Sequence, residues 1–312
     1  MKPDVLLMEP MMPEIEAKLD AAYQVHRLFK AEDTEAVISR VGKQIRGIVT
    51  GGGTGAKKAL VDALPALEII AINGIGTDAV DLDHARARSI RVTTTPDVLT
   101  DDVADLGLAL LLATARRVCF SDRFVRAGRW GQGGPALSTK VSGKRLGIFG
   151  FGRIGQAIAR RAEGFEMSIA YSNLHRVENV AYRYEPTLEG LARASDFLMI
   201  AVSASPATRG IVNRVVLDAL GPKGILINVA RGSVVDEAAL VVALAEGRLG
   251  GAGLDVFAHE PRVPEALWTM DNVVLQPHQA SATVETRLAM AELVLANLQA
   301  QFAGREPVTP VV

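Results

Sequence analysis

The fold is decided by residues 146–176, LGIFGFGRIGQAIARRAEGFEMSIAYSNLHR. The apolar run 146–149 predicts a buried strand, and the glycines that follow it, Gly150, Gly152 and Gly155, fit the pattern G-x-G-x-x-G. Between a strand and a helix, this pattern is typical of the turn that binds the pyrophosphate of a dinucleotide. We expect the backbone amides of the next helix, from Arg153 and Ile154 onward, to point at the phosphates because a helix N-terminus favours anions.

The end of the next predicted strand, residues 167–171, indicates which dinucleotide binds. An NAD site usually has an acid there, about 20 residues after the glycines, that holds the ribose hydroxyls. In this chain Ser172, Asn173, His175 and Arg176 stand there instead. Because a carboxylate would repel a 2′-phosphate and Arg176 could pair with it, the stretch favours NADP (NADPH), with NAD as the alternative. The other interpretation is that His175 and Arg176 belong to a solvated loop.

Short apolar strands alternate with helical patterns along almost the whole chain. The strands are continuously apolar, which is typical of parallel sheets covered by helices on both faces. We therefore expect an α/β fold with two doubly wound parallel-sheet domains, Rossmann-like or flavodoxin-like, and an interdomain active-site cleft. The expected strands cover residues 5–8, 24–29, 45–50, 67–72 and 90–94 in a first series, and 146–149, 167–171, 196–202, 225–230, 253–257 and 273–276 in a second.

The length of 312 residues also suggests two domains. A long helix over residues 99–118 is expected to join the two series, and a last helix over residues 283–302 would return the chain to the first one. The predicted domains are a discontinuous substrate-binding domain, residues 1–98 with 284–312, and an NADP-binding domain, residues 99–283.

Composition restricts the possible partners and the compartment. The formal net charge is −1, which gives no electrostatic sign of binding to nucleic acid or to a membrane surface. The N-terminus lacks a secretory signal, and no apolar run reaches the length of a membrane span. The chain has one cysteine, Cys119, which suits a reducing compartment. We expect a cytoplasmic protein without a metal site.

Three side chains of catalytic type follow the last three expected strands. They are Arg231, Glu260 and His278. Taken singly, Arg231 could form a structural ion pair, Glu260 could be a loop acid and His278 a capping residue. Ligands of open α/β sheets bind outside the carboxyl ends of the strands, however, so the three together predict an active site. A cation, an acid–base group and a carboxylate that tunes it are what a 2-keto acid dehydrogenase needs besides its nicotinamide.

At these motifs the chain resembles the D-isomer-specific 2-hydroxyacid dehydrogenases over essentially its full length. The resemblance rests on the glycine loop and on residues 228–237 (NVARGSVVDE), 251–261 (GAGLDVFAHEP) and 277–281 (PHQAS). Within this family, the chain looks most like the glyoxylate/hydroxypyruvate reductases and the hydroxyphenylpyruvate reductases. Many members carry Asp where Ser172 stands, so this departure again favours NADP.

The resemblance implies a role for each catalytic residue. His278 would be the proton donor, and Glu260 would hydrogen-bond to it. Arg231 would bind the substrate carboxylate and polarise the carbonyl. Asp255 would contact the nicotinamide carboxamide.

Further binding residues are implied by the same resemblance. Backbone amides around Gly51, Gly52 and Gly74 would complete the carboxylate site, to which Arg231 and His278 also belong. The remaining cofactor contacts would come from Thr100, Val202, Ser203, Ala204, Thr208, Val229 and Ala230. Many members have Pro near Ser203, which leaves the shape of that wall open.

We therefore expect an NADPH-dependent reductase of small 2-keto acids, such as glyoxylate or hydroxypyruvate, that forms D-2-hydroxy acids. Aryl pyruvates and sugar-derived keto acids are not excluded by the sequence. One alternative is an NAD-dependent dehydrogenase of a sugar-derived or phosphorylated 2-hydroxy acid. Another is a dinucleotide-sensing binding protein that resembles a corepressor. A homodimer is expected, formed through an arm over residues 127–142 in which Trp130 either reaches a neighbouring active site or only packs.

Overall fold

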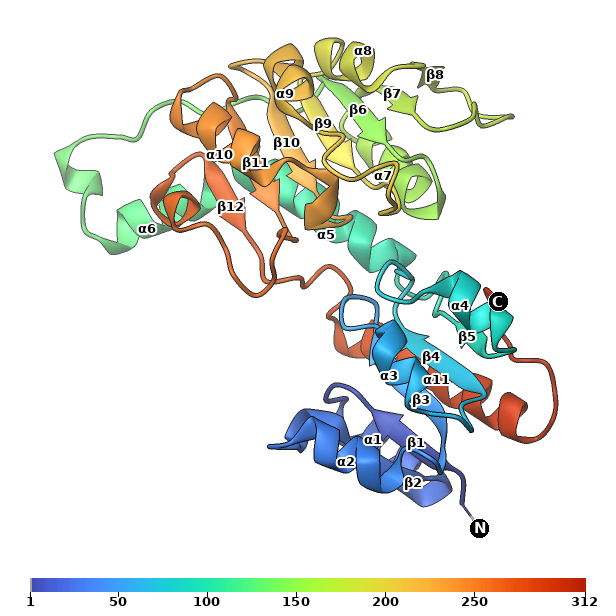
Figure 1. Ribbon diagram of the computed structural model, residues 1–312. Helices are drawn as coiled ribbons and strands as arrows, with labels where there is room; N and C mark the ends of the chain where they lie inside the picture. The colour runs from blue at the N-terminus through green and yellow to red at the C-terminus, as the bar shows by residue number, and fades with distance from the viewer. Residues whose placement is uncertain (1) are drawn as a thin grey trace. The chain divides into compact units, whose positions relative to one another are not determined.

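The computed structural model describes residues 2–312 and divides into two compact units (Figure 1). Unit 1 comprises the described residues up to Leu99 together with Ser281–Val312, and unit 2 comprises Thr100–Ala280. Each unit is a parallel sheet with helices on its faces, so the predicted fold class is confirmed. We describe each unit by itself.

The sheet of unit 1 has five strands in the order β2-β1-β3-β4-β5, all parallel. The sequence reverses direction across the sheet at β1, which lies between β2 and β3. In doubly wound folds this reversal, the topological switch point, is where ligands bind. The strands are β1 Asp4–Leu7, β2 Gln24–Arg27, β3 Ile45–Gly51, β4 Ile69–Asn73 and β5 Arg91–Thr93.

Apolar residues fill both faces of this sheet. On one face of the sheet, Val49 and Ala71 pack in a cluster with Leu19 and Leu298. On the other face, Ile48 packs in a second cluster with apolar residues of further helices. Continuous burial explains why these strands lack an alternating polar pattern. The helices of unit 1 are α1 Pro13–Ala22, α2 Thr34–Val41, α3 Lys58–Asp62, α4 Leu82–Ala87 and α11 Val284–Phe302, with a 3₁₀ turn η1 Leu28–Lys30.

The sheet of unit 2 has seven parallel strands in the order β12-β11-β10-β9-β6-β7-β8. Its order reverses at β6, directly before the glycine loop. The strands are β6 Arg145–Phe149, β7 Ser168–Ser172, β8 Arg183–Tyr184, β9 Phe197–Ile200, β10 Ile225–Asn228, β11 Gly251–Leu254 and β12 Val273–Leu275. The helices are α5 Thr100–Ala115, α6 Val118–Arg126, α7 Arg153–Glu163, α8 Leu188–Arg193, α9 Arg214–Leu220 and α10 Glu237–Ala245, with 3₁₀ turns η2 Trp130–Gln132, η3 Gly232–Val234 and η4 Glu265–Thr269.

Two strands of unit 2, β11 and β8, differ from the sequence-based expectation. The expected strand at 253–257 lies earlier, at Gly251–Leu254, where Ala252 pairs with Val273. The glycines there have low strand propensity, and pairing with neighbouring strands overrides it. The short β8 was not expected at all.

The long helix expected over residues 99–118 is wrong in its second half. Helix α5 ends at Ala115, whose carbonyl oxygen accepts a hydrogen bond from the amide of Thr139. Arg117 then takes a left-handed conformation, with φ +53°, and a separate helix α6 begins at Val118. Helix propensity continues across this point, so a tertiary contact and one backbone turn end the helix.

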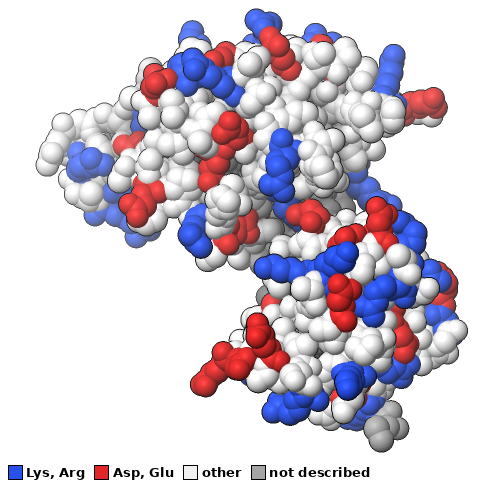
Figure 2. All heavy atoms as spheres, viewed as in Figure 1, with Lys and Arg blue, Asp and Glu red and all other residues white. Residues whose placement is uncertain are grey.

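Charges of both signs are mixed over the face of the molecule in Figure 2. No helix in the described part of the chain is long and apolar enough to cross a membrane.

Candidate active site

The glycine loop has the geometry that a dinucleotide pyrophosphate requires. Gly150 has φ +94°, and a Cβ at this position would lie 2.4 Å from the backbone nitrogen of Val202. A Cβ at Gly155 would lie 2.2 Å from the carbonyl oxygen of Gly150. Gly152 directly precedes α7, and a Cβ there would meet nothing within 4 Å. The loop is therefore closely packed at Gly150 and Gly155 and open at Gly152, where the amides of α7 begin. This arrangement fits the pyrophosphate of a dinucleotide cofactor.

The end of β7 carries no carboxylate. Ser172 is 4% exposed, and its carbonyl oxygen accepts a hydrogen bond of 2.9 Å from the amide of Gly150. Asn173 donates from its side chain to the carbonyl oxygen of His175 at 3.3 Å. His175 and Arg176 are exposed beyond the strand. This end of the strand thus presents a hydroxyl, an amide and two side chains able to carry positive charge.

The loop after β9 forms a second wall near Gly150. Thr208 accepts a hydrogen bond of 2.8 Å from the amide of Ser205 and donates one of 3.0 Å to the carbonyl oxygen of Ser203. These bonds fix the loop that contains Val202 and Ala204. Val229 and Ala230 follow the adjacent β10, and the amide of Val229 binds the carbonyl oxygen of Ile200. Thr100 is the first residue of α5.

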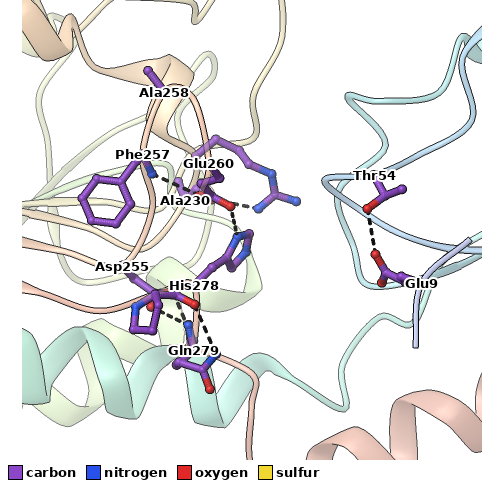
Figure 3. Close-up of polar contacts among 12 residues, drawn as sticks. Glu9, Thr54, Ala230, Asp255, Phe257, Ala258, Glu260, His278 and Gln279 are labelled. Atoms are coloured by element: carbon purple, nitrogen blue, oxygen red, sulfur yellow. Dashed lines mark hydrogen bonds and ion pairs between the residues drawn. The ribbon is translucent and has the colours of Figure 1, made fainter. Parts of the chain in front are cut away.

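His278 and Glu260 form a direct pair. The imidazole Nδ1 of His278 lies 2.7 Å from the carboxylate Oε2 of Glu260 (Figure 3). The other carboxylate oxygen accepts a hydrogen bond of 3.1 Å from the amide of Phe257. The pairing engages Nδ1, so Nε2 is the ring atom left for proton exchange with a ligand.

The environment of Glu260 favours its ionised form. Burial by itself would raise the pKa of Glu260, but the hydrogen bond to His278 and the positive charge of that ring lower it. The amide of Phe257 and the charge of Arg231 lower it further, so the pKa of Glu260 lies below its ordinary value. An ionised carboxylate can only accept a hydrogen bond, so His278 Nδ1 is the donor to Glu260.

The backbone at His278 is held in an unusual conformation. Its φ is +56°, and its amide donates a hydrogen bond of 2.8 Å to the carbonyl oxygen of Asp255. The buried Asp255 carboxylate accepts the amides of Gln279 at 2.7 Å and Ala280 at 3.1 Å. Burial raises the pKa of Asp255, although these two amides oppose the shift. A non-glycine residue in this region costs about 1–2 kcal/mol, and these three bonds hold it there.

In the structure, Asp255 therefore supports the His278 turn. Its side chain is 0% exposed, and both of its oxygens are engaged by backbone amides. The sequence expectation gave it a contact to the cofactor and did not foresee this support.

Arg231 is positioned by the loop after β10. Its carbonyl oxygen accepts a hydrogen bond of 3.0 Å from the side chain of Asn228, and its guanidinium donates one of 2.8 Å to the carbonyl oxygen of Ala230. A Cβ at the next residue, Gly232, would lie 1.9 Å from the carbonyl carbon of Phe257. Glycine therefore lets the Arg231 loop lie against the loop that leads to Glu260.

Two supporting residues were missed by the sequence reasoning. The side chain of Asn228 makes two hydrogen bonds within the turn that carries Arg231. Its nitrogen donates to the carbonyl oxygen of Arg231, and its oxygen accepts a hydrogen bond of 3.0 Å from the amide of Ala230. Glu237 accepts a hydrogen bond of 2.9 Å from the amide of Ala258, in the loop before Glu260. An asparagine at a strand end is a signal for such a turn, whereas nothing in the sequence marks Glu237.

The glycines expected at the substrate carboxylate belong to unit 1. Gly51 ends β3 and pairs with Asn73 at the end of β4. Gly52 and Gly74 lie side by side, since a Cβ at Gly74 would be 3.5 Å from the backbone nitrogen of Gly52. The structure thus brings these loops together at the carboxyl edge of one sheet.

This fold and site define a class: dehydrogenases with a Rossmann-type dinucleotide unit and a histidine–carboxylate pair at the strand ends. Residues 108–280 match the model of the D-isomer specific 2-hydroxyacid dehydrogenase NAD binding domain. The chain is 50% identical to a hydroxyphenylpyruvate reductase of Plectranthus scutellarioides, over 99% of this chain and 98% of the relative. It belongs to the D-isomer-specific 2-hydroxyacid dehydrogenase family, which confirms the resemblance seen in the sequence.

Other relatives in this family are similarly close. A 2-ketogluconate reductase of Gluconobacter oxydans is 47% identical, over 100% of this chain and 99% of the relative. The structure of an NADPH-dependent glyoxylate/hydroxypyruvate reductase from Sinorhizobium meliloti, in complex with NADP and malonate, superimposes with a TM-score of 0.94. It shares 46% sequence identity and covers 100% of this chain and 97% of its own.

Proposed function

We propose that this protein is an NADPH-dependent reductase that converts small 2-keto acids to D-2-hydroxy acids. The observation that carries the proposal is the His278–Glu260 pair at 2.7 Å, in a chain of the 2-hydroxyacid dehydrogenase family. Relatives that are 50% and 49% identical are a hydroxyphenylpyruvate reductase and a glyoxylate/hydroxypyruvate reductase, which favours a reductase over a dinucleotide-sensing binding protein. Glyoxylate and hydroxypyruvate are the first substrates to test.

The residues of unit 2 divide the reaction between them. When bound, NADPH supplies the hydride that reduces the carbonyl carbon. The protonated His278 donates the Nε2 proton to the carbonyl oxygen, and Glu260 stabilises the charged imidazole before that transfer. Arg231 binds the substrate carboxylate and draws electron density from the adjacent carbonyl.

The cofactor would be held by the glycine loop and the end of β7. Gly150, Gly152 and Gly155 shape the pyrophosphate turn. Ser172 and Arg176 favour NADPH, because no carboxylate stands there to repel a 2′-phosphate. The similar Sinorhizobium meliloti reductase, which binds NADP, supports this preference.

Backbone amides of unit 1 would bind a carboxylate group of a ligand. We assign this role to Gly52 and Gly74, whose backbones lie side by side. Gly51, which ends β3, precedes Gly52 and lies beside the carboxylate of Glu9.

The decisive experiment is a spectrophotometric panel of glyoxylate, hydroxypyruvate and phenylpyruvate with NADPH and with NADH. We expect oxidation of NADPH with at least one substrate and a preference for NADPH over NADH. Arg176→Ala should narrow that preference, whereas Arg193→Ala, in α8, should not. Tight NADPH binding without turnover on any 2-keto acid would contradict the proposed activity.

We further propose that the protein is a homodimer in the cytoplasm. Helix α6 has no buried residue, although Val118 and Val125 are apolar, and Trp130 and Leu137 in the following arm are 70% and 99% exposed. Such exposed apolar side chains suit burial against a second copy of the chain. The single Cys119 and the use of NADPH fit a reducing compartment. Sedimentation of Leu137→Ser beside the wild-type protein tests the dimer, which this change should weaken.

A further inference from the structure

Aromatic side chains gather beside the glycine loop of unit 2. Tyr171, the last residue but one of β7, is 0% exposed, and its ring stacks on that of Phe151 with the centroids 4.2 Å apart. Phe151 belongs to the glycine loop and is 1% exposed. The ring centroid of Tyr182 lies 5.5 Å from that of Phe151, and the ring centroid of Tyr184 lies 5.4 Å from that of Tyr171. We call these four residues the aromatic cluster.

The hydroxyl of Tyr171 binds the backbone beyond the end of its own strand. It donates a hydrogen bond of 3.1 Å to the carbonyl oxygen of Val177 and accepts one of 3.0 Å from the amide of the same residue. Val177 directly follows Arg176 in the sequence. The chain from Ser172 to Arg176 therefore forms a loop whose far end is fixed by one buried hydroxyl.

Two other hydroxyls of the aromatic cluster bind near this loop. Tyr184 donates a hydrogen bond of 3.3 Å to the carbonyl oxygen of Asn173, at the near end of the loop. Tyr182 donates one of 2.8 Å to the carboxylate Oε1 of Glu163, the last residue of α7. Hydrogen bonds from tyrosines thus hold the loop at both of its ends.

Tyr171 connects the two parts of the cofactor site that the proposed function requires. Its ring supports Phe151 in the glycine loop, which would bind the pyrophosphate, and its hydroxyl holds the loop that carries His175 and Arg176. The side chains of His175 and Arg176 are exposed. A loop that is ordered before binding loses less conformational entropy when it binds a ligand, so a fixed backbone there increases affinity for a phosphate.

We propose that Tyr171 is a positioning residue for the 2′-phosphate of NADPH, and that its hydroxyl strengthens the preference for NADPH by fixing the loop of His175 and Arg176. This inference rests on the proposed NADPH preference and names a buried residue that controls it. Without the hydroxyl, the loop loses two hydrogen bonds, and binding of a 2′-phosphate must order it. NADH has no 2′-phosphate, so its binding depends less on this loop.

The test uses Tyr171→Phe, which removes one oxygen atom and keeps the ring that stacks on Phe151. Calorimetry gives the Kd of adenosine 2′,5′-bisphosphate and that of adenosine 5′-monophosphate, which differ only in the 2′-phosphate. We expect the Kd of the bisphosphate to rise about fivefold or more and that of the monophosphate to change by less than about twofold. KM for NADPH should rise relative to KM for NADH in the same way. An equal change for both nucleotides would overturn the inference.

A second tyrosine provides the control. Tyr23→Phe removes the hydroxyl of a buried tyrosine in unit 1, which is 7% exposed, and should change neither Kd. If Tyr171→Phe does not fold, Tyr184→Phe decides by the same ratio of Kd values, because it releases the loop at Asn173. An unchanged ratio in that variant would also contradict the proposed role of the loop hydrogen bonds.

A double-mutant cycle then tests whether Tyr171 acts through the side chains of the loop. His175→Ala with Arg176→Ala removes both groups able to carry positive charge. Adding Tyr171→Phe to this variant should change the Kd of the bisphosphate by less than about twofold, because the positioned groups are gone. If Tyr171→Phe has its full effect in this background, Tyr171 does not act by positioning His175 and Arg176.

The outcomes separate this inference from the proposed function. If the wild-type protein binds both nucleotides equally and uses NADH as well as NADPH, the proposed preference is wrong and the inference fails with it. If the wild-type protein prefers the bisphosphate and Tyr171→Phe keeps that preference, the NADPH preference stands and the role of Tyr171 is wrong.

Discussion

The two units have the same kind of sheet and present different chemistry at its carboxyl edge. In unit 2, the loops after β10, β11 and β12 carry Arg231, Glu260 and His278, and Glu260 and His278 form a hydrogen-bonded pair. In unit 1, the corresponding edge carries glycines, the acid Glu9, and two buried oxygens that find no hydrogen-bond partner among residues 2–312. A parallel sheet thus provides a rigid platform in both units, and the residues after its strands decide what each platform does.

The difference lies in how completely each edge pairs its own polar groups. The edge of unit 2 is internally satisfied, because hydrogen bonds fix each charged side chain before a substrate arrives. Such preorganisation suits charge that develops in a transition state. The edge of unit 1 includes two buried oxygens, Asn73 Oδ1 and Thr95 Oγ1, for which the described part of the chain offers no hydrogen-bond partner.

Removing the proton donor of unit 2, His278, is expected to have the largest effect on catalysis. His278→Ala should lower kcat by about 10²–10⁴-fold, since general acid catalysis contributes that much, and should leave the Kd of NADPH nearly unchanged. Stopped-flow turnover and cofactor titration measure the two effects. His259→Ala removes an exposed neighbouring histidine and should retain turnover. A His278→Ala enzyme with near-normal kcat would remove this residue from the mechanism.

Removal of the positive charge of Arg231 should have the next largest effect on activity. Arg231→Ala removes charge-assisted hydrogen bonds worth about 1.5–3 kcal/mol each, so kcat/KM for 2-keto acids should fall by about tenfold to a hundredfold or more. Steady-state kinetics with glyoxylate measure this loss. Arg214→Ala, at an exposed ion pair within α9, serves as control. An unchanged kcat/KM would show that the substrate carboxylate is bound elsewhere.

The close packing of the unit 2 loops gives a prediction about stability. Gly232→Ala places a Cβ against the backbone of Phe257, so the free energy of unfolding should fall by about 1–3 kcal/mol. Because the same loops carry Arg231 and Glu260, kcat/KM should also fall. In Gly131→Ala the new Cβ meets nothing within 4 Å, and this variant should unfold like the wild type. Urea unfolding of both variants measures this difference. If Gly232→Ala is as stable as Gly131→Ala, the loops of Arg231 and Glu260 can move apart without loss of stability.

The smallest expected effect concerns the acid of the catalytic pair. The pKa of Glu260 is below its ordinary value in the folded chain, so ionised Glu260 contributes stability above the ordinary glutamate pKa. That contribution should be lost as the pH falls through the pKa of the folded state. The side chain of Glu260 is 35% exposed, so its effect should stay below about 1 kcal/mol.

This effect is measured as the difference in unfolding free energy between wild type and Glu260→Gln. The difference should be largest near neutral pH and should shrink toward acid pH. A difference that grows as the pH falls would reverse the inferred sign.

Much of the fold could be predicted from the sequence because its signals are local. Continuous apolar runs marked the strands of both sheets except β8, and the glycine pattern marked the turn after β6. The break between α5 and α6 could not be foreseen, since it depends on the left-handed Arg117 and on a hydrogen bond from Thr139 far along the chain. The strand at Gly251–Leu254 was displaced for a similar reason, because its pairing with β12 sets its bounds.

For the site, the sequence by itself determined the chemistry available: a dinucleotide turn without an acid after the next strand, and an arginine, a glutamate and a histidine at successive strand ends. Residue type and spacing suffice for this, because the period of a strand and the needs of a tight turn are local properties. Only the tertiary structure decided that Asp255 supports the His278 turn, that Gly232 lets two loops touch, and that Tyr171 stacks on Phe151 of the glycine loop. These residues come from separate strands and loops, and their proximity is set by sheet register and packing, which no short stretch of the chain contains.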